Sequence, residues 1–290
     1  MARVYEVGNI LNRDDMIGIG ANSNGMTIYA EDEISRVAGS RRGGIRAYWA
    51  AEAEEKIKSK PKFREMELKL RKLVALCYAT DELLADATAL ESWIMSAYPE
   101  EVNFVAEDSI FRGTGVGMPL GILNSAATVS VAKEVGQAAA TIVSANIDKM
   151  WARRYIRGRN YAWFVNQDTS PQLSALNRAS GGAGDLVYSP PGGISALPYA
   201  TLKGAPVIET EYNSTLGTVG DIILADFGEY QMIDKGGIQS ASSIHVQFVT
   251  DETVFRFVYR VDGMPKWDLP LTPFQGIKTV SPFITLATRA

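Results

Sequence analysis

The stretch LVALCYATDELLADATALESWI, residues 73–94, decides the fold, because it passes directly from a strand pattern into a helix pattern. Its first seven residues form the longest uninterrupted apolar run in the chain. Thr80 is the expected N-cap, and the two acidic residues after it stand where the helix dipole favours negative charge. Apolar residues then recur at helical spacing as far as about Phe111. They are Leu83, Ala87, Leu90, Ile94, Ala97 and Phe104.

This helix pattern is interrupted once, at Pro99. Proline removes a backbone donor, so we expect a kink or a restart of the helix there. The whole pattern covers up to about 30 residues, which is long for a helix of a globular protein. The glycine-rich loop that follows, residues 112–121, lacks the Lys-Ser/Thr pair of a phosphate-binding loop. We interpret it as a structural turn.

A charged hairpin is expected before the strand. Residues 26–37 are typical of a strand that loses its apolar character at Glu31, and residues 63–73 alternate apolar and charged side chains with a period of two. Between them lie a glycine-rich loop at residues 38–44 and a segment, 47–58, that fits either a short helix or the far end of the hairpin. A long charged hairpin cannot bury itself against its own chain, so it must project into solvent or lie on a partner.

Positive and negative charges are separated along this hairpin. Residues 56–72 hold eight bases and two acids, whereas residues 31–55 hold six acids and four bases. Such a separation suits pairing with a neighbouring copy of the chain. A nucleic-acid stacking platform is disfavoured because residues 56–72 hold a single aromatic residue, and a merely solvated surface remains the alternative. The candidate intersubunit contacts are Arg36, Arg41, Arg42, Arg46, Lys56, Lys58, Lys60 and Lys62.

The rest of the chain alternates short strands and helices, which indicates an α+β fold with one long helix, long hairpins and a mixed sheet domain between about residues 137 and 243. The best hairpin joins residues 244–249 to 254–261, with Asp262-Gly263 as a closing turn. Residues 179–198 are expected to form an ordered but mobile loop. The other expected strands are 128–132, 161–166, 201–209, 222–225, a turn and strand at 226–234, and 283–287, and the other expected helices are 137–155 and 170–178.

Composition excludes several classes of protein. The 290 residues carry 29 Lys and Arg against 33 Asp and Glu, and the net charge of −4 argues against binding nucleic acid by phosphate neutralisation. One cysteine forms neither an internal disulfide nor a cysteine-based zinc site, and one histidine excludes a multi-histidine metal site within a single chain. We find no apolar run of the about 20 residues that a membrane-spanning helix needs, and no signal-peptide core near the first residue.

Catalytic candidates are weak, and we predict no enzyme, cofactor or metal. His245 is the only conceivable general base, but it lies on the polar side of an alternating strand and no nucleophile elbow accompanies it. A hydrolase that uses His245 is therefore a weak alternative. Cys77 stands in an apolar run and is expected to be a buried structural thiol.

Six motifs follow one another along the chain: LVALCYATDELLADATALESWI (73–94), FRGTGVGMPLGILN (111–124), WFVNQDTSPQLSAL (163–176), LKGAPVIET (202–210), ILADFGEYQMIDKGGI (223–238) and VFRFVYRVDGMP (254–265). In this order they resemble the tailed-phage major capsid proteins of the Hong Kong 97 type. The first resembles the strand that leaves the family's extended loop and enters its spine helix, and the last resembles the peripheral-domain strand that ends in "RxDG". Each motif alone is weak, but together they are specific.

The resemblance implies a Hong Kong 97-like capsid fold in four parts. An N-terminal arm is expected at residues 1–30 and an extended β-hairpin loop at residues 31–77. The peripheral domain, with the long spine helix, is expected over residues 78–136 and 244–275, and the axial domain over residues 137–243 and 276–290.

The resemblance also implies a function. Members of this family form hexamers and pentamers that close into an icosahedral shell around double-stranded DNA, without sequence-specific binding. The implied partners are further copies of the chain, a portal, a scaffolding protein or maturation protease, and a decoration protein. The implied location is the virion capsid, assembled in the host cytoplasm. The alternative is an encapsulin-type nanocompartment shell, which shares the fold and encloses an enzyme. Since only a short arm precedes residue 30, scaffolding is expected to be a separate protein or a segment already removed.

Overall fold

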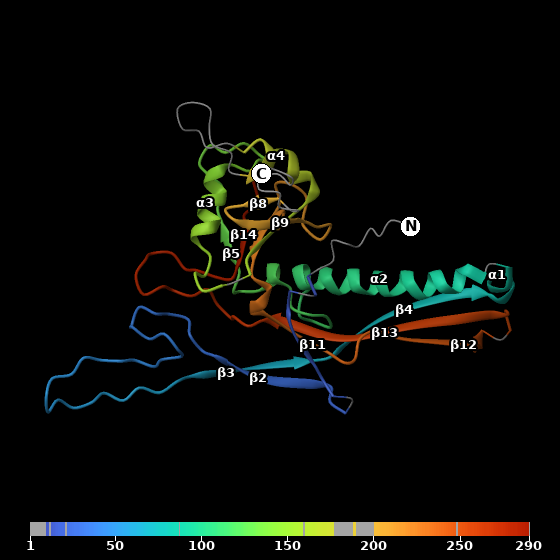
Figure 1. The fold of residues 1–290 in the computed structure, drawn as a ribbon, viewed down its shortest axis with the longest axis horizontal. Coiled ribbons are helices and arrows are strands. Elements are labelled where there is room, and N and C mark those ends of the chain that lie inside the picture. Colours follow the sequence, from blue (N-terminus) through green and yellow to red (C-terminus); the bar gives the residue numbers. More distant parts are fainter. Residues whose placement is uncertain are drawn as a thin grey trace.

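The computed structural model describes residues 10–11, 13–20, 22–86, 88–158, 160–176, 188–189, 200–247 and 249–289. Two larger sheets and one two-stranded sheet organise these residues (Figure 1). The mobile loop expected at 179–198 lies outside the described residues except for β7 (Tyr188–Ser189). No helix in the described part of the chain is both long and apolar enough to span a membrane.

The first sheet is built on one long strand, β13 (Glu252–Pro265). β13 pairs antiparallel with β4 (Arg71–Thr80) along one edge and with β12 (Gln239–Gln247) and β11 (Tyr230–Asp234) along the other. β1 (Asp15–Gly18) extends this sheet by pairing parallel with β11. The hairpin predicted from the sequence is confirmed as β12 and β13.

The closing turn expected at Asp262-Gly263 is wrong, because β13 continues through both residues to Pro265. Asp262 pairs with Ile233 and Gly263 pairs with Met232, so the strand has a partner where the turn was expected. A Cβ atom at Gly263 would lie 2.8 Å from Cε1 of the Tyr230 ring. The glycine is therefore needed for close packing rather than for a turn.

The long helix is confirmed as α1 (Asp81–Asp86) and α2 (Thr88–Arg112). Thr80 caps its start, since its Oγ1 accepts the backbone N–H of Leu83 at 3.4 Å. The restart expected at Pro99 is wrong: α2 runs through this residue without a break. Buried side chains on both sides of Pro99, at Ile94 and Val102, hold the helix on the sheet, so tertiary packing overrides the missing backbone donor.

One face of β13 and the inner face of α2 form the first core. The alternation predicted for β13 is confirmed, since Phe255, Phe257, Tyr259 and Val261 are buried while Arg256 and Arg260 are exposed. The rings of Tyr98 on α2 and Phe257 on β13 are stacked, with centroids 5.1 Å apart. In Figure 1, α2 lies along the length of β4 and β13.

The second sheet has seven strands in the order β5-β14-β10-β6-β9-β8-β7. Their bounds are β5 (Val129–Val131), β14 (Phe283–Leu286), β10 (Ile222–Ala225), β6 (Ala162–Val165), β9 (Ala205–Glu209) and β8 (Thr201–Leu202), in addition to β7. Its faces alternate cleanly: Phe164 and Ile223 enter the first core, whereas Trp163 and Leu224 enter a second core. The second sheet is thus covered on both sides and joins the two cores.

The helices beside the second sheet are shorter than the sequence predicts. α3 covers Ser144–Ala152 rather than 137–155, because the Gln137 amide donates to the Thr141 carbonyl and the Asn146 side chain instead of starting a helix. α4 covers Ser170–Ser174. Three short 3-10 turns complete the elements: η1 (Ile122–Asn124), η2 (Gln167–Thr169) and η3 (Phe227–Glu229).

Strands near residues 136 and 243, where domain boundaries are expected, pair with strands far away in the chain. β5, at residues 129–131, belongs to the seven-stranded sheet, whereas β11 and the first half of β12 belong to the sheet of β13. The sheet of each strand is set by its pairing partner, which lies far away in the chain: β5 pairs with β14, and β11 pairs with β13.

The N-terminal segment is tied to the first sheet. Ile10 is buried in the first core and β1 pairs with β11, so the described part of this segment contacts the body of the molecule, while residues 1–9 of the expected arm lie outside the described residues. β2 (Gly25–Glu31) and β3 (Phe63–Lys69) then form the two-stranded sheet, which confirms both predicted strands. The helix offered as one alternative for residues 47–58 is wrong, since these residues form an irregular loop.

Replacing Phe257 by Ala is expected to lower the free energy of unfolding by about 3–5 kcal/mol, because a fully buried ring and its stack on Tyr98 are lost. Val258→Ala is the matched control, since Val258 follows directly but is only half-buried on the opposite face. Chemical denaturation of both variants measures the difference. Equal losses would show that α2 does not pack on this face of β13.

Candidate functional site

The candidate site is the loop between β2 and β3, together with the residues that attach it to the body of the molecule, which we call its base. The two limbs of the loop approach each other at Gly43, whose carbonyl accepts the backbone N–H of Lys62 at 2.7 Å. A Cβ at Gly43 would lie 2.6 Å from the Lys62 carbonyl oxygen, and its φ of 56° is in the left-handed region. Glycine is therefore required at this neck. We call residues 44–61, beyond the neck, the distal loop.

Almost every residue of the distal loop is exposed. Tyr48, Trp49 and Ile57 are large apolar residues that it presents to solvent, and the Trp49 side chain is fully exposed. Its internal hydrogen bonds are few, such as that from the Arg46 backbone N–H to Ser59 Oγ at 3.2 Å. Figure 1 shows the distal loop reaching beyond the body of the molecule at one end, while β4, β12 and β13 extend toward the other.

The two-stranded sheet carries the loop to the body. Met66 and Leu68 on β3 are buried while Glu65, Glu67 and Lys69 are exposed, as the period of two predicts. The backbone N–H of Lys69, at the end of β3, donates to Asp262 Oδ2 at 2.8 Å. This bond fixes the end of the loop to β13.

A second attachment lies at the other limb of the loop. Ser35 forms a parallel bridge with Thr272, whose N–H donates to the Ile34 carbonyl and whose carbonyl accepts the Arg36 N–H, both at 2.9 Å. The loop is therefore held at its base by backbone pairing on one limb and by Asp262 on the other.

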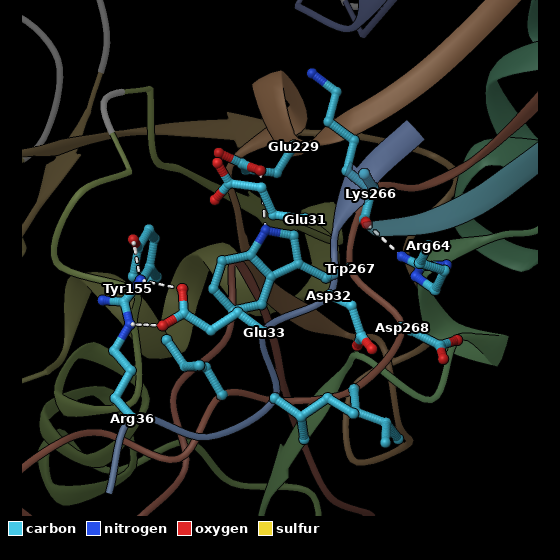
Figure 2. A pocket seen from close by; sticks show the side chains of 14 residues that line it. Glu31, Asp32, Glu33, Arg36, Arg64, Tyr155, Glu229, Lys266, Trp267 and Asp268 are labelled. Carbon is cyan, nitrogen blue, oxygen red and sulfur yellow. Dashed lines mark hydrogen bonds and ion pairs between the residues drawn. The ribbon is translucent and has the colours of Figure 1, made fainter. Parts of the chain in front are cut away.

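Side chains reinforce this base, as Figure 2 shows. The Arg36 guanidinium donates to both carboxylate oxygens of Glu33 at 3.1 Å and to the Tyr155 hydroxyl at 3.2 Å. The Tyr155 ring meets Trp267 edge to face, with centroids 4.8 Å apart. Since the Arg36 and Glu33 side chains are 13% and 9% exposed, this bidentate pair is shielded from water.

The same base encloses a pocket of about 310 Å³, which we call the hinge pocket. Trp267 Nε1 donates to Glu229 Oε2 at 2.9 Å, and Arg64 Nη2 donates to the Lys266 carbonyl at 2.6 Å. Burial raises the pKa of the Glu229 carboxyl, while the Trp267 donor and the Lys266 charge oppose this rise. The charged residues that line the pocket are Glu31, Asp32, Glu33, Glu229, Asp268, Arg36, Arg64 and Lys266.

The eight candidate contact residues fall into three groups. Arg36 is engaged inside its own chain at the hinge pocket. Arg42 pairs with Glu31 at 3.1 Å, but both side chains are largely exposed. The other six are exposed and form no ion pair with another described residue. These six are Arg41, Arg46, Lys56, Lys58, Lys60 and Lys62.

Sequence reasoning missed the residues that anchor the loop. Tyr155, Glu229, Lys266 and Trp267 come from segments more than 100 residues away from Arg36 along the chain. No short motif connects them, so only the packing of the two sheets brings them together. The one available signal was the apolar and aromatic composition just after β13.

The catalytic candidates lie apart from this site. His245 is exposed on β12, where its backbone N–H bonds to Ser243 Oγ at 3.3 Å. Cys77 is half-buried rather than fully buried, and it lies against Tyr98. In the glycine-rich turn, a Cβ at Gly113 would lie 2.1 Å from the Pro119 carbonyl oxygen, which supports a structural turn. Among the described residues, His, Cys, Asp and Glu form no group of three or more suited to a metal ion.

Comparisons with known proteins give one family and one fold. The family model described as the phage capsid family matches residues 22–275. Similar solved structures include the capsid of an empty GTA particle, with a TM-score of 0.73 at 16% identity over 100% of this chain and 92% of that chain. They also include a structure from Mycobacterium phage Adephagia, with a TM-score of 0.65 at 11% identity over 96% of this chain and 89% of that chain. The capsid of Myoviridae phage XM1 has a TM-score of 0.62 at 11% identity over 96% of this chain and 90% of that chain. The comparison with curated proteins found no match.

Arg36→Ala is expected to weaken the base of the loop by about 1–3 kcal/mol, because it leaves the shielded Glu33 carboxylate without its bidentate partner. Arg42→Ala is the matched control, with an expected loss of at most about 1 kcal/mol, since its pair with Glu31 is exposed. Hydrogen exchange of residues 31–43 measures both. Similar protection in the two variants would contradict the anchoring role of Arg36.

Proposed function

The chain belongs to the phage capsid family and is a structural protein of the virion capsid shell, and we propose that its copies assemble as hexamers and pentamers into an icosahedral shell around the double-stranded DNA of a tailed phage. Its fold is the Hong Kong 97-like fold that the motifs predict. The five-fold symmetry with which the similar GTA capsid was solved supports the pentamer. The shell itself has no catalytic role, and assembly takes place in the host cytoplasm.

The observation that carries this proposal is the distal loop. It is an exposed segment with aromatic residues at its tip and an anchored base. A monomeric protein gains nothing in stability from such a segment, because its apolar side chains stay in water. A subunit of a shell gains stability from such a segment, since a neighbouring copy can cover its apolar side chains.

The two sheets suggest the division into domains. The layer of β13 and α2 corresponds to the peripheral domain, and the seven-stranded sheet corresponds to the axial domain. The arm is the segment before β2, and the extended loop is the segment from β2 to β3. The axial domains would surround the symmetry axes of hexamers and pentamers, while the peripheral domains would point outward between them.

The receiving surface for the loop is the face of β4 and β13 that points away from α2. Val74, Leu76 and Tyr78 on this face of β4 are 42%, 50% and 52% exposed. Arg256 is the pairing partner of Leu76, and Arg260 is the pairing partner of Lys72. The face therefore combines an apolar row with three positive charges.

The tip of the distal loop has the complementary character. It exposes Trp49 beside the acidic residues Glu52, Glu54 and Glu55. Within one chain the tip cannot reach this face, because β3 and β4 run in the same direction (Figure 1) and the 15 residue steps from Phe63 to Tyr78 span about 50 Å. We therefore propose that the tip of a second copy's distal loop occupies this face, because its acidic residues and Trp49 complement the positive charges and the apolar row.

The other partners follow from the shell. A closed shell that takes up a genome needs a portal, and assembly of the correct curvature needs a scaffolding protein or a maturation protease. A decoration protein would bind outside. The net charge of −4 suits a container that holds DNA without neutralising it, so we propose enclosure without sequence-specific binding.

Deleting residues 45–60 and joining Gly44 to Pro61 through a short Gly-Ser linker tests the role of the distal loop. Because the neck at Gly43 and Lys62 and the hinge pocket remain, the variant is expected to fold with an unchanged melting temperature. It is expected to form no closed shells by negative-stain electron microscopy and sedimentation, under conditions in which the intact chain does. Normal shells from the deletion variant would overturn the proposal.

A charge exchange tests the receiving surface. Reversing Glu52, Glu54 and Glu55 to Lys is expected to reduce assembly, since the loop tip then meets Arg256 and Arg260 with like charge. Combining this variant with Arg256→Glu and Arg260→Glu is expected to restore assembly. The matched control is the same loop variant combined with Arg41→Glu and Arg42→Glu, which changes net charge equally but lies elsewhere. Equal rescue by both combinations would rule out a specific contact.

A further inference from the structure

The N-terminal arm docks on α2 through one buried carboxylate. Glu107 is buried and accepts the Tyr212 hydroxyl at 2.6 Å. It also accepts the backbone N–H groups of Ile10 and Leu11, where the arm enters the first core. The arm then makes a tight turn, in which the N–H groups of Arg13 and Asp14 donate to the Ile10 carbonyl at 2.8 and 3.2 Å.

This turn places a second carboxylate beside the first. Both side-chain oxygens of Asp14 are shielded from solvent, and neither has a hydrogen-bond partner among the described residues. Glu107, on α2, is a charged group that acts electrostatically on Asp14. Buried carboxyl groups are normally hydrogen-bonded or paired with a cation, so an unpartnered one calls for an explanation.

Among the described residues, none donates a hydrogen bond to the Asp14 carboxyl group and no cation pairs with it. Tyr230 on β11 and Tyr259 on β13 face it electrostatically, but the Tyr230 hydroxyl donates to the Leu120 carbonyl at 3.0 Å. The neighbouring Asp15 is already paired with Lys266 at 2.6 Å. An ionised Asp14 would therefore sit in an apolar site next to the negative charge of Glu107, whereas a protonated Asp14 would not.

We propose that the N-terminal arm is held on α2 by a proton-dependent latch, in which Glu107 receives the arm and Asp14 must carry a proton while the arm is docked. When Asp14 ionises, Ile10 and Leu11 leave Glu107 and the carboxylate of Asp14 enters water. This device belongs to the single chain and does not depend on the proposed assembly.

The direction of the pH dependence follows from the burial. Burial first, and the Glu107 charge second, raise the pKa of Asp14 well above its usual range. The pKa of Glu107 is also raised by burial, although its three donors oppose this. Since the docked arm binds a proton that the free arm releases, docking is complete below the ordinary carboxyl pKa. It weakens as the pH rises, and is lost once the pH exceeds the raised pKa of Asp14.

Hydrogen exchange of the purified full-length chain tests the latch. Protection factors of peptides that cover residues 10–18, corrected for intrinsic exchange, are compared from pH 5 to pH 8. We expect the protection to fall with rising pH, by up to about tenfold per pH unit for one coupled proton. Peptides of β13 serve as the internal reference, because this strand lies in the first core and should keep its protection throughout.

Three variants make the test specific. Asp14→Asn is expected to keep the arm protected at every pH, because its side chain stays neutral. Glu107→Gln removes the like charge that raises the pKa of Asp14, so the loss of arm protection between pH 5 and pH 8 is expected to be smaller than in the wild type. Asp15→Asn is the matched control and should follow the wild type, since Asp15 is exposed and paired with Lys266. Equal arm protection at pH 5 and pH 8 in the wild type, or an unchanged pH profile in Asp14→Asn and Glu107→Gln, would overturn the proposal.

Discussion

The backbone pairing of β13 on both edges is the interaction on which the first sheet, the packing of α2 and the attachment of the loop depend. Residues 254–258 of this strand pair with β4 on one side and β12 on the other, and its last residues pair with β11. Because these pairings fix the register of three strands at once, they also fix which side chains of β13 face α2. The attachments of the loop follow from the same strand, since Asp262 holds the end of β3 and Lys266 and Trp267, directly after β13, line the hinge pocket.

Local patterns were sufficient for the elements that bury one face. The alternation of Phe255, Phe257 and Tyr259 and the helical spacing from Thr80 to Phe111 both predicted the observed structure. The failures occurred where a residue with a strong local preference is overruled by distant packing. Pro99 stays inside α2 because Ile94 and Val102 hold the helix on the sheet, and Gly263 serves close packing on Tyr230. The sheet to which β5 and β11 belong could not be read from local patterns, because their pairing partners lie more than 25 residues away.

The exposed, charged part of the loop could be predicted from the sequence, but the residues that hold its base could not. Charge separation along residues 31–72 is visible in the sequence, because solvated residues keep their character whatever surrounds them. Arg36 shows the limit of that reasoning. It is one charge among eight in the sequence, yet the fold places it against Glu33 and Tyr155, where it anchors the loop rather than meeting solvent. The buried pair of Asp14 and Glu107 was equally invisible, since the two residues are 93 positions apart.

The neck at Gly43 and Lys62 separates the length of the loop from the stability of the body. The two limbs are joined by a backbone hydrogen bond before the distal loop begins, so the body does not depend on what lies beyond. The entropic cost of closing a flexible loop grows only with the logarithm of its length, by about 0.6 kcal/mol for each doubling. Insertions and exchanges of sequence beyond the neck are therefore thermodynamically cheap. A lineage of such chains can change the reach and chemistry of this segment while the two cores remain the same.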